Sequence, residues 1–178
     1  MKNKIAAKRT KVRDRQRSRV YKWEQLAAFP NAYEAHTPRL TLPECQALVN
    51  KVWRDYETSR RTPPKVTDGR GRRRAAAQGD SLIKLPRWSR VREIVLHEIA
   101  HTLLHNHMQK QGIDLEVHGA EFVGLLIDLL YEYAEANRDE LTASAKRFGV
   151  RATDTVVPHR EEVEPAYIQQ RLILTTNP

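Results

Sequence analysis

The chain has 178 residues and a formal net charge of +9, from 31 lysine and arginine residues against 22 aspartate and glutamate residues. Hydrophobic residues make up 40% and charged residues 30%, which is typical of globular rather than disordered chains. The most apolar run, residues 122–130, is far shorter than the roughly 20 residues that cross a bilayer, and no secretory signal is recognisable. A single cysteine, Cys45, excludes an internal disulfide and a cysteine zinc ribbon. These features predict one folded domain with appended segments in the cytoplasm.

The positive charge is concentrated near the start of the chain. Residues 2–22 hold ten basic residues and one acid, Asp14, a balance that equals the whole net charge of +9. Apolar residues at helical spacing between Val20 and Ala27 predict a helix that ends near Phe29 and packs one stripe onto the body. Because its other faces are positive, we expect either a solvated helix or a contact with nucleic acid or another polyanion through residues 2–22.

The next segments predict an α+β domain. Thr41 and Glu44 form a capping-box pair at the start of an amphipathic helix. Turn-forming pairs at residues 68–69 and 79–80 then separate three short segments. We expect these segments to form a three-stranded antiparallel sheet whose last strand is residues 81–85.

Three more helices follow in the predicted order. Ser89 is placed to cap a helix that runs to about Asn106. Another helix begins near His118 and carries leucines on its buried side. A shorter helix, capped by Asn137, ends at Gly149.

A five-residue motif in the first of these helices predicts a metal site. Its sequence is His97-Glu98-Ile99-Ala100-His101, which places two imidazoles four residues apart, so that both point toward one position that a zinc ion can occupy. Glu98 can then reach a metal-bound water without itself being a ligand. Zinc lowers the pKa of such a water toward roughly 7, and the carboxylate can accept its proton during attack on a carbonyl carbon. The competing interpretation is a pair of core histidines satisfied by neighbouring hydrogen bonds.

A catalytic zinc ion usually has three protein ligands, and the third is sought outside the motif. We expect it to be His118, because Gly119 beside it would allow the backbone to approach the site closely. Glu121, one helical turn later, is an alternative that would complete a His-His-Glu site or support a ligand from behind.

Two other histidines are weaker candidates for the third ligand. His107 lies at the spacing that metzincins use, but Leu104 occupies the position where that pattern needs a glycine. His105 continues the face of the motif, yet about 12 Å of helix separates it from His97, too far for both to share an ion with His101.

The motif and the segment His118-Gly119-Ala120-Glu121-Phe122 together resemble the SprT-like zinc metalloproteases, and most closely a group of small HExxH-type metallohydrolases of bacteria and phages. The likeness is strongest over residues 82–130 and weaker over residues 13–150. This resemblance implies a small zincin-like domain of the minimal gluzincin type. It also implies that His118 is the third zinc ligand, beside His97 and His101, and that Glu98 is the catalytic base.

We therefore expect a zinc-dependent metallohydrolase, specifically a metallopeptidase that acts on a protein or peptide substrate. The substrate would lie as an extended strand beside residues 81–85. Residues 1–30 would form the basic helical arm, residues 31–150 the zincin-like catalytic domain, and residues 151–178 a tail. A hydrolase of non-peptide amides would use the same zinc chemistry.

The alternative function belongs to another class. It is a non-catalytic protein that binds nucleic acid or a protein assembly through its basic arm and holds a structural zinc ion. A fourth protein ligand in the water position, such as Asp114 or Glu121, would indicate this function.

Overall fold

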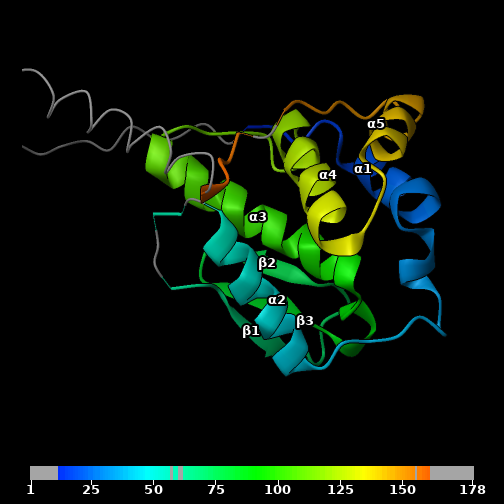
Figure 1. Cartoon of the computed structure of the whole chain (residues 1–178), viewed down its shortest axis with the longest axis vertical. Helices are drawn as coiled ribbons and strands as arrows, with labels where there is room; N and C mark the ends of the chain where they lie inside the picture. The colour runs from blue at the N-terminus through cyan, green and yellow to red at the C-terminus, as the bar shows by residue number, and fades with distance from the viewer. Residues whose placement is uncertain (1–11, 57, 60–61, 155, 161–178) are drawn as a thin grey trace, which may run out of the picture.

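The computed structural model describes residues 12–56, 58–59, 62–154 and 156–160, and Figure 1 shows their arrangement. Within this part of the chain, the elements are α1 (Arg17–Trp23), α2 (Leu42–Asp55), β1 (Lys65–Asp68), β2 (Ala76–Gln78), β3 (Leu82–Leu85), α3 (Arg92–Gln111), α4 (Ala120–Ala134) and α5 (Arg138–Arg147). A π-helical turn, Glu24–Ala28, follows α1, and 3-10 turns lie at Pro30–Tyr33 and Arg87–Ser89. The predicted α+β class is confirmed.

Helix α3 is the central element of the fold. It lies between the sheet and α2 on one side and α4 on the other (Figure 1). Every residue from Ile94 to Ala100 is buried, so this stretch is enclosed on all sides rather than along one stripe. Polar side chains in such a stretch must find partners inside the protein. This enclosure places His97 and Glu98 in the interior.

The predicted helix caps at α2 and α5 are confirmed. The backbone N–H of Glu44 donates to Thr41 Oγ1 over 3.3 Å, and the Thr41 N–H donates back to the Glu44 carboxylate over 2.7 Å. The backbone N–H of Glu140 likewise donates to the Asn137 side chain over 3.1 Å. Capping needs only residues a few positions apart, which is why it can be read from the sequence.

The predicted antiparallel sheet is wrong. Strand β1 pairs in parallel with β3, β2 pairs with β3 in the antiparallel sense, and the order is β1-β3-β2. The turn at Gly79 is as expected, with φ +59°, but the chain after β1 does not fold back beside β1. Gly69 instead packs so tightly against Pro86 that an added Cβ would lie 2.5 Å from the Pro86 Cδ atom. The chain thus passes the end of β3 and returns on its other side, which makes β2 an edge strand.

The start of α3 also differs from the prediction. Ser89 lies in a 3-10 turn, where its hydroxyl donates to the carbonyl oxygen of Pro86 over 2.8 Å, so it does not cap the helix. Val91 occupies the N-cap position instead. The helix continues past Asn106 to Gln111 and ends at Gly112, whose φ is +67°.

The described part of the basic arm packs against the body as a structural element. Val20 and Trp23 of α1 are fully buried, as predicted, and the Trp23 indole donates to Ser144 Oγ on α5 over 2.9 Å. Gln16 is also fully buried and exchanges two hydrogen bonds with the backbone of Arg151. Residues 1–11 of the arm and residues 161–178 of the predicted tail lie outside the described residues. The contact with nucleic acid stays a prediction.

Within the described part of the chain, no helix combines the length and the apolar character that crossing a bilayer requires.

Candidate metal centre

Three imidazoles from α3 and the start of α4 converge on one point. His97 and His101 lie one turn apart on α3, and His118 lies two residues before α4. Each offers a ring nitrogen, and these three atoms lie within 4.8 Å of one another. The Nε2 atoms of His97 and His101 are 3.1 Å apart. Zinc–nitrogen bonds of about 2.0–2.1 Å in a tetrahedral site separate two ligand nitrogens by roughly 3.3 Å, so the spacing fits a shared ion.

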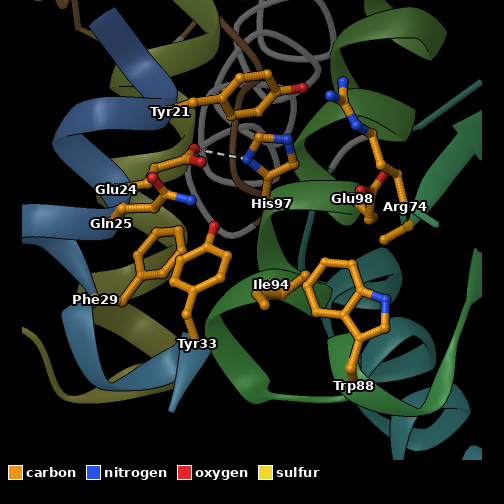
Figure 2. A pocket seen from close by; sticks show the side chains of 11 residues that line it. Tyr21, Glu24, Gln25, Phe29, Tyr33, Arg74, Trp88, Ile94, His97 and Glu98 are labelled. Atoms are coloured by element: carbon orange, nitrogen blue, oxygen red, sulfur yellow. Dashed lines mark hydrogen bonds and ion pairs between the residues drawn. The ribbon is translucent and has the colours of Figure 1, made fainter. Parts of the chain in front are cut away.

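The ring of His97 is held from behind by Glu24 in the π-helical turn. Its Nδ1 lies 2.7 Å from Glu24 Oε1, shown as the dashed line in Figure 2. The Glu24 side chain is only 1% exposed and that of His97 7%, so water does not compete for this bond. A histidine that donates its Nδ1 proton to a carboxylate keeps its Nε2 lone pair free for a metal.

The ring of His118 is held in the same way by Asp14, which precedes α1. The Nδ1 atom of His118 and the Oδ2 atom of Asp14 are 2.7 Å apart. The other ring nitrogen of His118, Nε2, is buried and has no hydrogen-bond partner among the described residues. A buried polar atom without a hydrogen-bond partner costs about 1–3 kcal/mol of folding free energy. Binding of a metal ion by this nitrogen, beside the other two imidazoles, would remove that cost. The donor set therefore fits a divalent ion such as zinc.

Two aromatic rings pack against the imidazole cluster. The ring of Phe122 stacks on His101 at a centroid distance of 4.4 Å, and its edge contacts His97 and His118, each at 5.1 Å. Tyr21 of α1 stacks on His97 at 5.9 Å and meets His118 edge-on at 5.0 Å. These contacts restrict the orientation of all three imidazoles.

The surroundings keep two of the imidazoles neutral. Burial, with the charges of His97 and His118, holds the pKa of His101 well below its usual value. Burial also lowers the pKa of His118, although the hydrogen bond that it donates to Asp14 opposes this shift. For His97, burial lowers the pKa, but the charge and hydrogen bond of Glu24 outweigh it and the pKa is raised overall. Neutral imidazole is the form that binds metal.

Glu98 is a buried carboxylate beside this cluster. Burial is the main cause that raises its pKa, while the charge of His97 and a hydrogen bond from the backbone N–H of Ala77 oppose the rise. Ala77 belongs to the edge strand β2, so the sheet itself helps to position the carboxylate. A carboxylate whose pKa is raised is a stronger base than a solvated one, which suits it to accept a proton.

Two cavities of about 220 and 300 Å³ open on either side of this centre and share Tyr21, Ala75, His97 and Glu98 in their walls. The smaller one extends toward Phe29, Tyr33, Trp88 and Ile94, and Figure 2 shows it. The larger one runs along β2 and α3 past His101. The candidate centre is therefore accessible from a cleft rather than closed in the core.

The other predicted ligands do not join the cluster. Neither Glu121, His107 nor Asp114 belongs to the group of metal-capable side chains in the described part of the chain. His105 lies instead against the turn between β2 and β3, where a Cβ on Gly79 would come within 3.3 Å of its ring. The ligand roles of His97, His101 and His118 stay predictions, supported by their convergence.

The predicted role of Gly119, to let the backbone approach the metal site closely, does not agree with the structure. A Cβ at this position would meet the side chains of Glu116 and Glu121, each at 2.9 Å, rather than the imidazoles. The glycine thus serves the turn that begins α4, and only indirectly positions His118.

Sequence reasoning missed three residues of the centre, Asp14, Tyr21 and Glu24. All three come from the arm that was interpreted as a polyanion-binding or solvated segment. One signal was present, since Asp14 is the single acid among the ten basic residues of positions 2–22. Tyr21 and Glu24 are three residues apart, which predicts that they share one helix face, and the structure shows that both contact His97.

Comparisons of the chain with family models, with curated proteins and with solved structures find no match.

Proposed function

We propose that this protein is a zinc-dependent metallohydrolase, and specifically a metallopeptidase with a zincin-like, SprT-like site. The observation that carries the proposal is the convergence of His97, His101 and His118 beside the buried carboxylate of Glu98, at the junction of two cavities. Two of these imidazoles are supported by carboxylates, an arrangement that is common behind metal-ligating histidines.

The residues of the chain divide the work of hydrolysis. His97, His101 and His118 would hold zinc, which supplies a Lewis acid that polarises the substrate carbonyl and makes water acidic. Glu98 accepts a proton from the attacking water and passes it to the departing amine, which its raised pKa favours. Asp14 and Glu24 would hold His118 and His97 in the tautomer that leaves Nε2 free to bind the ion.

The edge of the sheet offers a place for an extended substrate. The earlier prediction of substrate pairing beside residues 81–85 is wrong, because β3 is the central strand and has a neighbour on each side. Strand β2 is the edge strand next to the site, and Ala76 and Ala77 line the larger cavity. A peptide that pairs with β2 would bring its carbonyl groups toward His97 and Glu98.

The alternative, a structural zinc site in a binding protein, depends on a fourth protein ligand. Within the described residues the cluster contains three candidate ligands, and His97 and Glu98 border cavities. This leaves a coordination position for water, which favours a catalytic centre over a structural one.

A series of full-length variants tests the proposal. Elemental analysis should find stoichiometric zinc in the wild type, loss of zinc in His97→Ala and His118→Ala, and retention in the matched control His107→Ala. Glu98→Gln should keep zinc and reduce turnover of a defined peptide mixture, followed by mass spectrometry, by about 10²–10⁴-fold. Zinc retained in His118→Ala, or full turnover in Glu98→Gln, would contradict the assigned roles.

A further inference from the structure

We propose that the smaller cavity binds an apolar side chain of the substrate, with aromatic rings held most tightly, at one of the two residues that flank the scissile bond. This inference rests on the proposed function for the chemistry, but the binding preference can be measured without turnover. The motif of residues 97–101 does not by itself specify such a pocket, because it supplies only His97 and Glu98 and the other walls come from other parts of the chain.

Aromatic and aliphatic side chains from four separate segments line about half of the cavity, and Glu24, Gln25, Arg74, His97 and Glu98 line the rest (Figure 2). Phe29 and Tyr33 stack at a centroid distance of 6.2 Å and form one wall. Trp88, which precedes α3, and Ile94, which belongs to α3, lie on the opposite side of the cavity. Trp88 is 41% exposed and Tyr33 38% exposed, although both are large apolar groups. Exposed aromatic groups around a hollow are typical of a ligand-binding surface, since a bound apolar group would cover them.

The size of the cavity matches one side chain. Its volume is about 220 Å³, while an apolar cavity of about 150 Å³ is sufficient to hold benzene. A phenyl, indole or leucine side chain therefore fits, and two aromatic rings do not.

The charges around the cavity disfavour ionised side chains. Glu24 and Glu98 lie in its wall, so the carboxylate of an acidic substrate residue would meet like charge. The carboxylate of Glu24 is already paired with Nδ1 of His97. The exposed guanidinium of Arg74 at the rim would repel the positive charge of a substrate lysine or arginine. A lysine or arginine would in addition lose hydration against the aromatic walls. An uncharged apolar side chain avoids these costs.

The position of the cavity sets which substrate residue occupies it. Tyr21, His97 and Glu98 form its inner wall and are also the wall of the second cavity along β2. A side chain bound in the smaller cavity thus belongs to a residue adjacent to the carbonyl that Glu98 serves. The remaining substrate would continue along the larger cavity.

Binding can be tested with the full-length Glu98→Gln protein, with and without zinc, by calorimetric titration of capped pentapeptides Ala-Ala-X-Ala-Ala. We expect X = Phe to bind about 10–100-fold more tightly than X = Ala, the factor that burial of one large apolar side chain supplies, with Leu between them and Glu and Lys no better than Ala. Equal affinity for the Phe and Ala peptides would overturn the inference.

Variants of the pocket wall test the location. Trp88→Ala, which removes an exposed wall, and Ile94→Phe, which fills the cavity, should each reduce the Phe-over-Ala preference at least several-fold. Tyr131→Ala is the matched control, because Tyr131 is 52% exposed on α4 and does not line the cavity. A cooperative thermal unfolding transition would show that each variant is folded. A preference unchanged in Trp88→Ala, with the protein folded, would place the binding site elsewhere.

Turnover by the wild type separates the two proposals. Digestion of a random peptide library should enrich Phe, Tyr, Leu and Met on one constant side of the cleaved bond. Cleavage without that enrichment would refute the pocket and leave the peptidase. Phe-selective binding without any cleavage would keep the pocket and refute the peptidase.

Discussion

The bond between Glu24 and His97 has a measurable consequence for metal affinity. Glu24→Ala would leave the Nδ1 proton of a buried imidazole without its acceptor 2.7 Å away, at a cost of about 1–3 kcal/mol. Loss of a carboxylate that orients a metal-bound histidine usually lowers affinity about 10–100-fold, which equals roughly 1.4–2.7 kcal/mol. The two magnitudes agree. We therefore expect zinc to bind 10–100-fold more weakly to Glu24→Ala, by the same principle.

Glu24→Gln refines this prediction, since its amide oxygen can still accept the bond but carries no charge. Charge-assisted hydrogen bonds are about twice as strong as neutral ones, so about half of the free energy should remain and affinity should fall about 3–10-fold. Asp14→Ala should weaken zinc less than Glu24→Ala, because the Asp14 side chain is 22% exposed and water can replace it at His118.

The assay is competition for zinc with a chromophoric chelator at pH 7, on full-length protein. Glu34→Ala is the control, because Glu34 contacts His36 over 3.0 Å at the surface and lines neither of the two cavities. It should bind zinc as the wild type does. Wild-type affinity in Glu24→Ala would refute the reasoning, since the buried carboxylate would then contribute nothing to the ligand.

Three further predictions concern other parts of the structure. Tyr21→Phe should retain zinc and lower kcat about 10²-fold. The Tyr21 hydroxyl extends over His97 toward the side of Glu98 (Figure 2), where it can donate a hydrogen bond to the substrate carbonyl oxygen as that oxygen gains negative charge. An unchanged kcat in steady-state assays would show that the Tyr21 ring contributes packing only. Gly124→Ala should destabilise the fold by about 1–3 kcal/mol in urea unfolding, because its methyl group would collide with the carbonyl oxygen of Thr153, and an unchanged midpoint would argue against that close approach. Burial raises the pKa of Cys45 to about 11, so a thiol reagent at pH 8 should modify it only after unfolding. The unfolded thiol ionises first, so stability should fall as pH rises from about 9 toward 11; rapid modification of the native protein would contradict this burial.

The N-terminal segment shows where charge counting is a poor guide to role. Composition directed attention to its ten basic residues, yet the structure uses its single acid, Asp14, to hold a candidate ligand. Glu24 does the same for His97 from 73 residues away in the chain, and Asp14 for His118 from 104 residues away. The local sequence does not identify the partner in pairings across such distances, even where one member, such as Asp14 among basic residues, is unusual in its own neighbourhood.

The sheet was mispredicted for a related reason. Glycine-containing pairs at residues 68–69 and 79–80 do mark changes of direction, but such pairs specify only that the chain turns. Which strand becomes the neighbour of β1 is decided by packing against α2 and α3, and by the contact of Gly69 with Pro86. As a result β2 rather than β3 is the edge strand beside the site, and the proposed substrate pairs with β2.

Short-range physics in the chain itself determined most of the helices, the caps of α2 and α5 and the common direction of His97 and His101, because each depends on residues within one or two turns. Only the tertiary structure determined which carboxylates hold the imidazoles, that β1 pairs in parallel with β3, and which aromatic side chains line the smaller cavity. These features join segments far apart in sequence, and their energies arise from burial and mutual contact that exist only once the chain has folded around α3.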